Sequence, residues 1–168
     1  MKNNLNTFPF FLGLSNKEIE LFTSNMMMID FKKDENILTE GVEGHSLLFV
    51  LEGEITISKA LTLVTNKMDE NDNREKTLTK LSSKDTKIML GEIALFSPDK
   101  KRNATVIAIK DCKVAKLDFD KIFEICNNDS ELGYKIMRNL SEITAKNLID
   151  ANHKVLKLTT AFSLLIDH

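Results

Sequence analysis

The sequence SLLFVLEGEITIS, residues 46–58, contains two short runs of apolar and β-branched residues on either side of the turn signal Glu52-Gly53. Short runs of this kind, bounded by turn residues, are typical of β-strands. Similar runs recur at residues 26–31 (MMMIDF), 77–82 (TLTKLS) and 104–118 (ATVIAIKDCKVAKLD). Many short strands at this spacing predict an antiparallel β-roll with a jelly-roll-like architecture. The polar stretch 66–76 is expected to be a solvated hairpin loop.

Helical patterns flank this predicted roll. Ser15 followed three residues later by Glu18 matches a capping box, which predicts a short helix before the first strand. After the last strand run, residues 118–128 (DFDKIFEICNN) predict a second short helix, which Asp118 or Asp120 would cap. The predicted fold class is therefore mainly β with flanking helices.

A longer helical pattern begins near Ser130 and continues toward the C-terminus for roughly 36 residues, or about 50 Å at 1.5 Å per residue. The early apolar positions are expected to pack on the roll: Leu132, Ile136, Leu140 and Ile143. A later stripe has heptad spacing, which favours pairing with a second copy of the chain: Leu148, Ala151, Val155, Leu158, Phe162 and Leu165. The alternative is that the whole stripe packs within one chain.

Length and composition limit the classes of function. The 168 residues suffice for about one domain with an appendage, and we divide them into the roll with its short flanking helices, 1–128, and a long dimerisation helix, 129–168. A net charge of −2 excludes a strongly basic nucleic-acid-binding surface as the dominant feature. Cys112 and Cys126 are too few for a disulfide framework or a zinc site. No run approaches the ~20 apolar residues of a membrane span, and we expect a cytoplasmic protein.

The stretch LGEIALFSPDKKRNATV, residues 90–106, carries the chemistry. Residues 93–95 can form one helical turn after Gly91 and Glu92, and a basic cluster ends in Arg102. The start of a helix presents free backbone N–H groups to an anion, and glycine lets a ligand approach the backbone closely. The guanidinium of Arg102 suits a two-point contact with a phosphate. Glu92 would repel a phosphate and is suited to accept a hydrogen bond from a sugar hydroxyl.

This stretch resembles the phosphate-binding cassette of cyclic nucleotide-binding domains. In the bacterial regulators of that family, the Gly of the Gly-Glu pair and the Arg lie eleven positions apart, as Gly91 and Arg102 do here. The flanks also resemble the family, and with them the resemblance covers nearly the whole chain: FLGLSNKEIELF (11–22), ENILTEGVEGHSLLFVLEGEITI (35–57) and LSEITAKNL (140–148). It implies a β-roll followed by a long helix, with cAMP or cGMP as the ligand and no cofactor.

The resemblance also implies a role for each matching residue. Glu92 would bind the ribose 2′-hydroxyl, and Arg102 would bind the exocyclic phosphate oxygens. Asn103 could bond the phosphate or a purine edge. Asn152, on the long helix, could cap the purine across a dimer interface, although an amide serves either purine and does not choose between cAMP and cGMP. Backbone contacts would come from Gly91, Ile93 and Ala94.

The sequence departs from the family pattern in three places. Ser83-Lys84-Asp85 replaces the Gly-Asp turn that usually precedes the cassette, and His45 stands where the family often has Asp, as an exposed turn residue. The chain stops at His168, about where a helix-turn-helix domain follows in the catabolite activator protein. It is either a stand-alone sensor or a truncated regulator, and we expect it to bind DNA poorly by itself.

Other functions receive less support from the residues. A degenerate member of the family could keep the roll and the helix pair and serve protein–protein interaction without a nucleotide. A metal-dependent cupin needs clustered His and carboxylate ligands, and the histidines are isolated: His45, His153 and His168. No Gly-x-Ser-x-Gly nucleophile elbow occurs. The hypothesis is therefore a homodimeric, non-enzymatic sensor in which phosphate binding changes the packing of the C-terminal helix, with an unidentified downstream partner.

Overall fold

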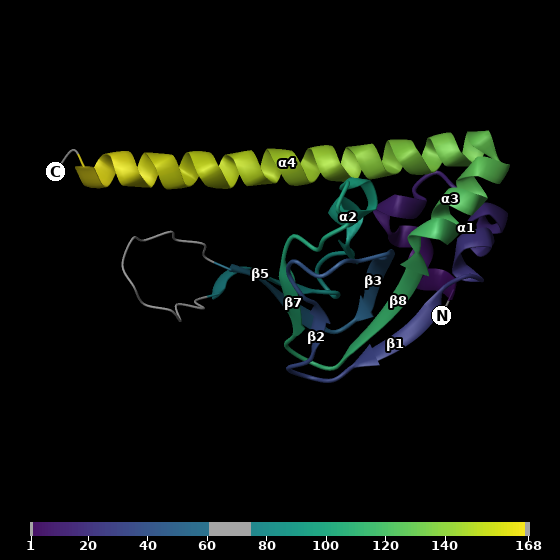
Figure 1. The fold of residues 1–168 in the computed structure, drawn as a ribbon, viewed down its shortest axis with the longest axis horizontal. Coiled ribbons are helices and arrows are strands. Elements are labelled where there is room, and N and C mark those ends of the chain that lie inside the picture. Colours follow the sequence, from purple (N-terminus) through teal and green to yellow (C-terminus); the bar gives the residue numbers. More distant parts are fainter. Residues whose placement is uncertain (1, 61–74, 167–168) are drawn as a thin grey trace.

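The computed structural model describes residues 2–60 and 75–166, which form a two-sheet roll with helices on one side (Figure 1). The long C-terminal helix lies against these helices and continues beyond them. Residues 66–74 of the expected hairpin loop lie outside the described residues, and residues 75 and 76 belong to a strand.

Eight strands of the described chain pair antiparallel in two four-stranded sheets, which confirms the predicted β-roll. The first sheet has the order β1-β8-β3-β6, with β1 at Met27–Phe31, β8 at Cys112–Asp118, β3 at Ser46–Glu52 and β6 at Ile88–Leu90. The second has the order β2-β7-β4-β5, with β2 at Asn36–Leu38, β7 at Thr105–Ala108, β4 at Glu54–Ala60 and β5 at Glu75–Ser82.

Strand β3 is buried on both faces, which explains its continuous apolar sequence. Leu48 and Val50 belong to the cluster between the two sheets, whereas Leu47 and Phe49 belong to the cluster under the helices. Phenylalanine rings fill much of this second cluster, with neighbouring centroids between 4.8 Å and 5.9 Å apart: Phe8, Phe10, Phe11, Phe22 and Phe49. The first sheet is therefore the central layer of the fold.

Three short helical segments precede the sheets: the 3₁₀ helices η1, Lys2–Thr7, and η2, Pro9–Phe11, and the α-helix α1, Asn16–Thr23. The predicted capping box is confirmed, because the backbone N–H of Glu18 donates to Ser15 Oγ at 3.3 Å and that of Ser15 donates to Glu18 Oε2 at 2.6 Å. These bonds lower the pKa of Glu18 to about 2, and the bond from the Ser15 backbone has the largest effect. Lys135 Nζ, 2.9 Å from Glu18 Oε1, joins α1 to the long helix.

Helix α3, Phe119–Asn128, follows β8 directly. Asp118 occupies its N-cap position, but the side chain makes no capping hydrogen bond, so the expectation that Asp118 caps the helix is wrong. The carboxylate instead pairs with Lys116 Nζ at 3.1 Å. Asp120 lies in the first turn, where a negative charge is favourable.

The long helix α4, Ser130–Ile166, has two halves with different surroundings. In its first half, Leu132, Ile136 and Leu140 are fully buried in the cluster under the helices, which confirms that this part packs on the body of the protein. Asn139 Nδ2 donates to Phe10 O at 3.0 Å and to Leu12 O at 2.9 Å, and so fastens the segment around η2 to α4.

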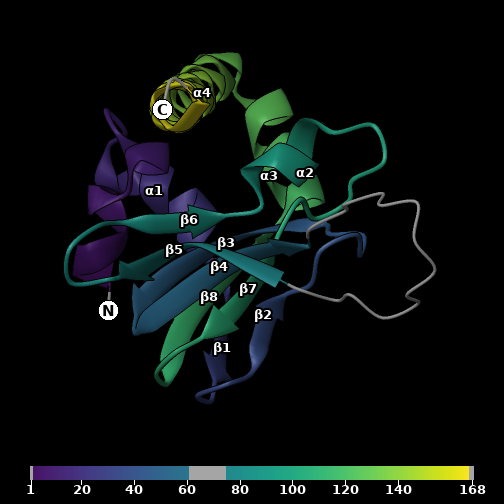
Figure 2. The same cartoon turned by 90° about the vertical axis from the view of Figure 1, so that its left-hand side faces the viewer.

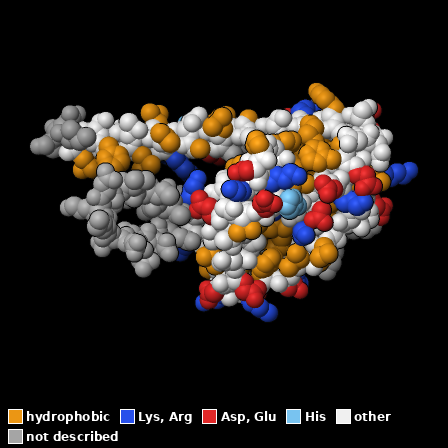
Figure 3. Space-filling view, in the orientation of Figure 1, with side chains coloured by type: hydrophobic (Ala, Val, Ile, Leu, Met, Phe, Trp, Pro, Cys, Tyr) orange, Lys and Arg blue, Asp and Glu red, His pale blue; other side chains and the backbone are white. Residues whose placement is uncertain are grey.

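The second half of α4 projects past the roll, and Figure 2 views the molecule along it. The apolar stripe stays uncovered within the single chain, where its large members are 53% to 75% exposed: Leu148, Val155, Leu158, Phe162 and Leu165. Figure 3 shows hydrophobic side chains along this half of the helix. The alternative in which the whole stripe packs within one chain is therefore wrong for the described residues. None of the described helices is both long and apolar enough to cross a membrane.

Candidate functional site

The cassette, residues 90–106, runs along the chain from β6 in the first sheet to β7 in the second sheet. Its helix α2, Glu92–Phe96, confirms the predicted helical turn. Gly91 is the N-cap residue and adopts a left-handed conformation with φ of +93°, which favours glycine. A Cβ at this position would overlap Arg102 Nη1 and lie 2.8 Å from Ser46 O. Gly91 therefore permits the close approach of the Arg102 side chain to the start of α2.

The backbone around Arg102 is bonded to the turn that precedes β3. Arg102 N–H donates to Val42 O at 2.9 Å, and Gly41 N–H donates to Arg102 O at 2.8 Å. Gly44 N–H donates to Lys100 O at 2.9 Å. These bonds fix the direction in which the guanidinium enters the protein.

The guanidinium of Arg102 is buried and only partly satisfied. The residue is 7% exposed, and its Nη2 donates to Ser46 O at 2.9 Å and to Ser46 Oγ at 3.4 Å. Its Nη1 is buried without a hydrogen-bond partner among the described residues. Burial lowers the pKa of Arg102, but a guanidinium remains charged in proteins. Because a buried charged donor without a partner is costly, this atom is a strong candidate for binding an anion.

A carboxylate stands beside this cation. Glu92, the first residue of α2, accepts a hydrogen bond from Asn147 Nδ2 of α4 at 3.1 Å through its Oε1. Burial is the largest influence on Glu92 and raises the pKa of its carboxyl, while the bond from Asn147 and the charge of Arg102 oppose that rise. The site therefore combines an anion-binding donor, a hydrogen-bond acceptor and a direct contact to the long helix.

The structure brings only part of the predicted set together. Gly91, Glu92 and Arg102 meet in space; of the other cassette residues, Ala94 is 1% exposed and Ile93 is 46% exposed. Asn103 is exposed beside Arg102 in the chain. Asn152 is exposed on the projecting half of α4, and the proposal that it reaches a purine from a second copy stays a prediction.

Sequence reasoning missed three residues of the site. Ser46 holds the guanidinium of Arg102, and Gly44 leaves room for it, because a Cβ there would overlap Arg102 Nε. Asn147 holds Glu92. Gly44 was visible only as a turn glycine and Asn147 only as a polar residue in a helical pattern. His45, between Gly44 and Ser46, is exposed as expected, with Nε2 3.6 Å from Glu43 Oε2.

Two cavities adjoin the site. A cleft of about 290 Å³ reaches Arg102 and Ser46 from the side of β1 and β2, and its lining is mostly apolar. A larger groove of about 720 Å³ does not touch Arg102, but it includes Asn147, the partner of Glu92. The larger of these two cavities therefore lies next to the cassette and does not contain Arg102.

Known proteins match this chain in sequence and in fold. The family model of the cyclic nucleotide-binding domain matches residues 28–129. A CRP-like cAMP-activated global transcriptional regulator from Mycobacterium tuberculosis is 24% identical over 143 residues, which cover 83% of this chain and 58% of the relative. The cAMP-activated global transcriptional regulator Vfr from Pseudomonas aeruginosa is 28% identical over 109 residues, which cover 63% of this chain and 45% of the relative. The chain spans about half the length of these curated relatives.

The fold is also similar to that of the catabolite activator protein from Thermus thermophilus. The TM-score is 0.72 at 20% identity, and the match covers 90% of this chain and 63% of that one. This likeness supports the same roll with a long C-terminal helix. Because the family model spans more than half of the residues and includes the cassette, the chain belongs to the family of cyclic nucleotide-binding domains.

Proposed function

We propose that this chain is a sensor that binds cAMP or cGMP in the cassette and transmits binding through α4. The observation that carries the proposal is the buried Nη1 of Arg102, which has no partner among the described residues and lies against Gly91. An exocyclic phosphate oxygen would satisfy it with a charge-assisted hydrogen bond. Glu92 would accept the hydrogen bond of the ribose 2′-hydroxyl.

The remaining predicted contacts complete this proposal. The backbone of residues 91, 93 and 94 would contact the ligand at the turn, and Asn103 would bond the phosphate or a purine edge. The roll, residues 1–128, would then be the binding part, and residues 129–168 would transmit the signal. We infer a regulatory role without catalysis, in the cytoplasm and without DNA binding by this chain alone. The names of the M. tuberculosis and P. aeruginosa relatives, both described as cAMP-activated, support cAMP as the first ligand to test.

Asn147 is the contact through which ligand binding at Glu92 would act on α4. Its Nδ2 donates to Glu92 from α4 across 55 positions of sequence. A ribose hydroxyl at Glu92 would compete with or reorient this amide and thereby change the packing of α4 on the cassette. Such a change acts as a population shift between two arrangements of the helix.

A ligand titration by thermal unfolding tests the proposal. At a hundred times its dissociation constant, a ligand adds about 2.7 kcal/mol to the free energy of unfolding. For a chain of this size, this corresponds to about 5–10 °C in melting temperature. We expect this rise with cAMP or cGMP and none with adenosine, which lacks the phosphate. No rise with either cyclic nucleotide would favour the second candidate, a protein-interaction module, which the uncovered stripe on α4 supports.

Replacing Glu92 with glutamine should stabilise the ligand-free protein while weakening nucleotide binding. The folded-state pKa of Glu92 is raised, so the folded protein holds this proton more readily than the unfolded chain. The ionised carboxylate therefore lowers stability at neutral pH, and this loss disappears as the pH falls through the folded-state pKa. We expect Glu92→Gln to melt above the wild type at pH 7, with the difference vanishing toward about pH 4.

Calorimetry of both proteins across this pH range measures the effect. Glu124→Gln, which alters a carboxylate that is 57% exposed and pairs with Lys121 Nζ at 2.6 Å, is the matched control and should not melt above the wild type at pH 7. The same Glu92→Gln variant should bind cAMP about tenfold more weakly, because a hydrogen bond to a charged acceptor becomes one to a neutral acceptor. If Glu92→Gln melted below the wild type at pH 7, the expected stabilisation would be contradicted.

The apolar stripe of α4 should pair two copies of the chain. Leu158 is 53% exposed in the single chain and lies at a seam position of the heptad pattern. Leu158→Glu would place an unpaired carboxylate from each copy in the seam, which should weaken the dimer about a hundredfold or more. Sedimentation equilibrium measures this loss. Thr160→Glu, on the opposite side of the helix, should leave the dimer intact. Equal weakening of the dimer by both variants would argue against pairing through the apolar stripe.

A further inference from the structure

The projecting half of α4 carries more apolar surface than the apolar stripe. Ile149 and Leu156 lie outside the stripe and are 54% and 65% exposed in the single chain. They belong to a line of uncharged residues along this half of the helix, which we call the adjacent band: Ile149, Asn152, Leu156, Thr159 and Ser163. A two-helix heptad seam covers the stripe alone and leaves the adjacent band in water.

The adjacent band lies at nearly a right angle to the apolar stripe. Ile149 directly follows Leu148, and Leu156 directly follows Val155, so each large residue of the band comes one position after a residue of the stripe. Consecutive residues of an α-helix point about 100° apart around its axis. In a square four-helix bundle, each helix meets its two neighbours in directions that differ by about 90°. The two surfaces of α4 therefore match the geometry of such a bundle.

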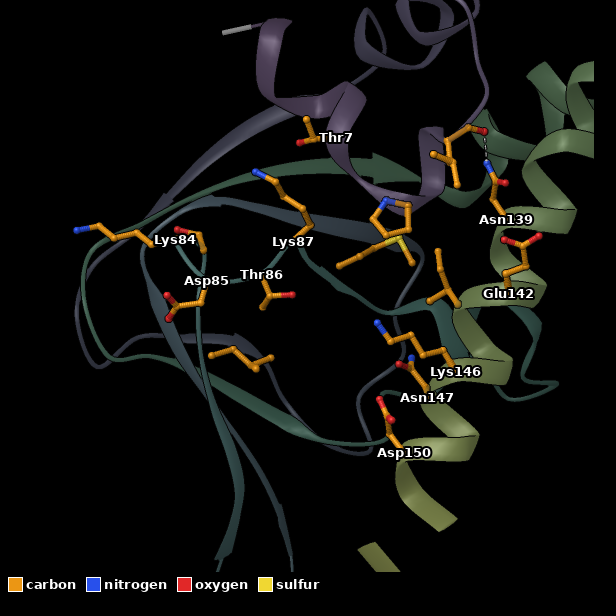
Figure 4. A pocket seen from close by; sticks show the side chains of 16 residues that line it. Thr7, Lys84, Asp85, Thr86, Lys87, Asn139, Glu142, Lys146, Asn147 and Asp150 are labelled. Atoms are coloured by element: carbon orange, nitrogen blue, oxygen red, sulfur yellow. Dashed lines mark hydrogen bonds between the residues drawn. The ribbon is translucent and has the colours of Figure 1, made fainter. Parts of the chain in front are cut away.

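The roll does not obstruct the adjacent band. Ile149 follows the buried Leu140 by nine residues, or about two and a half turns, and therefore points away from the body of the protein. The side of α4 that borders the groove beside the roll carries charge instead, and Figure 4 shows Asp150 there. Lys154 and Lys157 also lie outside both the stripe and the band. The projecting half thus separates a charged side from two apolar ones.

The polar residues of the adjacent band are compatible with burial. Thr159 Oγ1 donates to Val155 O at 3.0 Å, and Ser163 Oγ donates to Thr159 O at 3.1 Å. Because these hydroxyl donors are satisfied within the helix, their burial leaves no donor without a partner. The amide of Asn152 can both donate and accept a hydrogen bond across a helix contact. Without any charge, the band favours another uncharged surface of the same kind.

Further copies of the chain offer that surface. A contact between two identical bands is self-complementary about a two-fold axis, as is a contact between two identical stripes. The two contacts together close a bundle of four α4 helices and leave the charged side of each helix in water. We propose that the adjacent band joins two pairs of chains, so that this protein assembles as a tetramer. The inference rests on the proposed pairing through the apolar stripe and not on nucleotide binding.

Sedimentation equilibrium of the full chain over a range of protein concentrations tests the proposal. We expect the mass of the wild type to rise to four times the 19.1 kDa of one chain. Leu156→Glu should stop at two chains, because it places a carboxylate from each copy in the band contact and leaves the stripe unchanged. Leu156 is 65% exposed in the single chain, so the variant should fold, and its far-UV circular dichroism should match that of the wild type.

Two further variants separate the band from the rest of the helix. Lys157→Glu is the matched control, because Lys157 directly follows Leu156 and lies on the charged side, and it should still form tetramers. Leu158→Glu, in the apolar stripe, should lose both the tetramer and the dimer.

The proposal is overturned if the wild-type mass levels off at a number of chains other than four at concentrations up to about 1 mM. It is also overturned if Lys157→Glu and Leu156→Glu give the same mass, or if Leu156→Glu yields single chains, because the band would then not act separately from the stripe. The measurements use the protein without nucleotide, so their failure leaves the proposed cyclic nucleotide site untouched. Failure of nucleotide binding likewise does not decide the number of chains.

Discussion

Arg102→Ala should weaken cyclic nucleotide binding between tenfold and a hundredfold. Hydrogen bonds to a charged group are worth about 1.5–3 kcal/mol each, and 1.4 kcal/mol corresponds to a factor of ten in affinity. The effect should be large because Arg102 is 7% exposed, so water cannot easily replace its lost charge beside the phosphate. Isothermal titration with cAMP and cGMP measures the loss.

Two further variants separate loss of the site from loss of the fold. Arg102→Met keeps most of the volume of the side chain and removes a buried donor that lacks a partner in the ligand-free protein. We expect it to lose binding as Arg102→Ala does while retaining a melting temperature close to that of the wild type. Lys101→Ala changes the exposed neighbouring cation and should leave the affinity within about twofold. Equal losses for Lys101→Ala and Arg102→Ala would place the phosphate elsewhere.

Gly91→Ala should abolish most nucleotide binding without touching a charged residue. The added Cβ would overlap Arg102 Nη1 and approach Ser46 O to 2.8 Å, so the guanidinium must leave its position. The left-handed backbone at φ +93° adds strain of roughly 1–2 kcal/mol for a residue with a Cβ. We expect affinity to fall by more than tenfold and the melting temperature to fall by several degrees.

Gly41→Ala provides the matched control for the backbone. Gly41 has a similar φ of +79°, but no atom outside its chain neighbours lies within 4 Å of the added Cβ. It should therefore lower the melting temperature and leave nucleotide affinity nearly unchanged. If Gly41→Ala reduced affinity as much as Gly91→Ala does, backbone strain and not displacement of Arg102 would explain the loss. Titration and thermal unfolding of both variants distinguish these outcomes.

The fold follows largely from local patterns. The continuous apolar run of β3 is what a strand buried on both faces requires, and the capping box of Ser15 and Glu18 marks the start of α1 directly. Asp118 was misjudged, because Lys116 on the same face of β8 competes for its carboxylate. Propensity places such an aspartate at a helix start but says nothing about a neighbouring cation.

The candidate site was partly predictable, because part of it is also local in the sequence. Gly91, Glu92 and Arg102 lie within one short segment, so their residue types and the resemblance of that segment to the family's phosphate-binding cassette predicted an anion-binding turn. Ser46 lies 56 positions from Arg102, and Asn147 lies 55 positions from Glu92. No periodicity links residues so far apart, and their contacts depend on how the sheets and α4 pack.

The sequence by itself determined the longer strand runs, the short helices α1 and α3 and the heptad stripe of α4, and it predicted the three cassette residues, because each depends on neighbours within a few positions. Only the tertiary structure decided that Arg102 is buried with one donor unsatisfied, that Asn147 connects Glu92 to α4, and that a groove lies between α4 and the turn 83–87. Burial, unsatisfied hydrogen bonds and cavities arise when distant segments exclude water together, and no single segment contains that information.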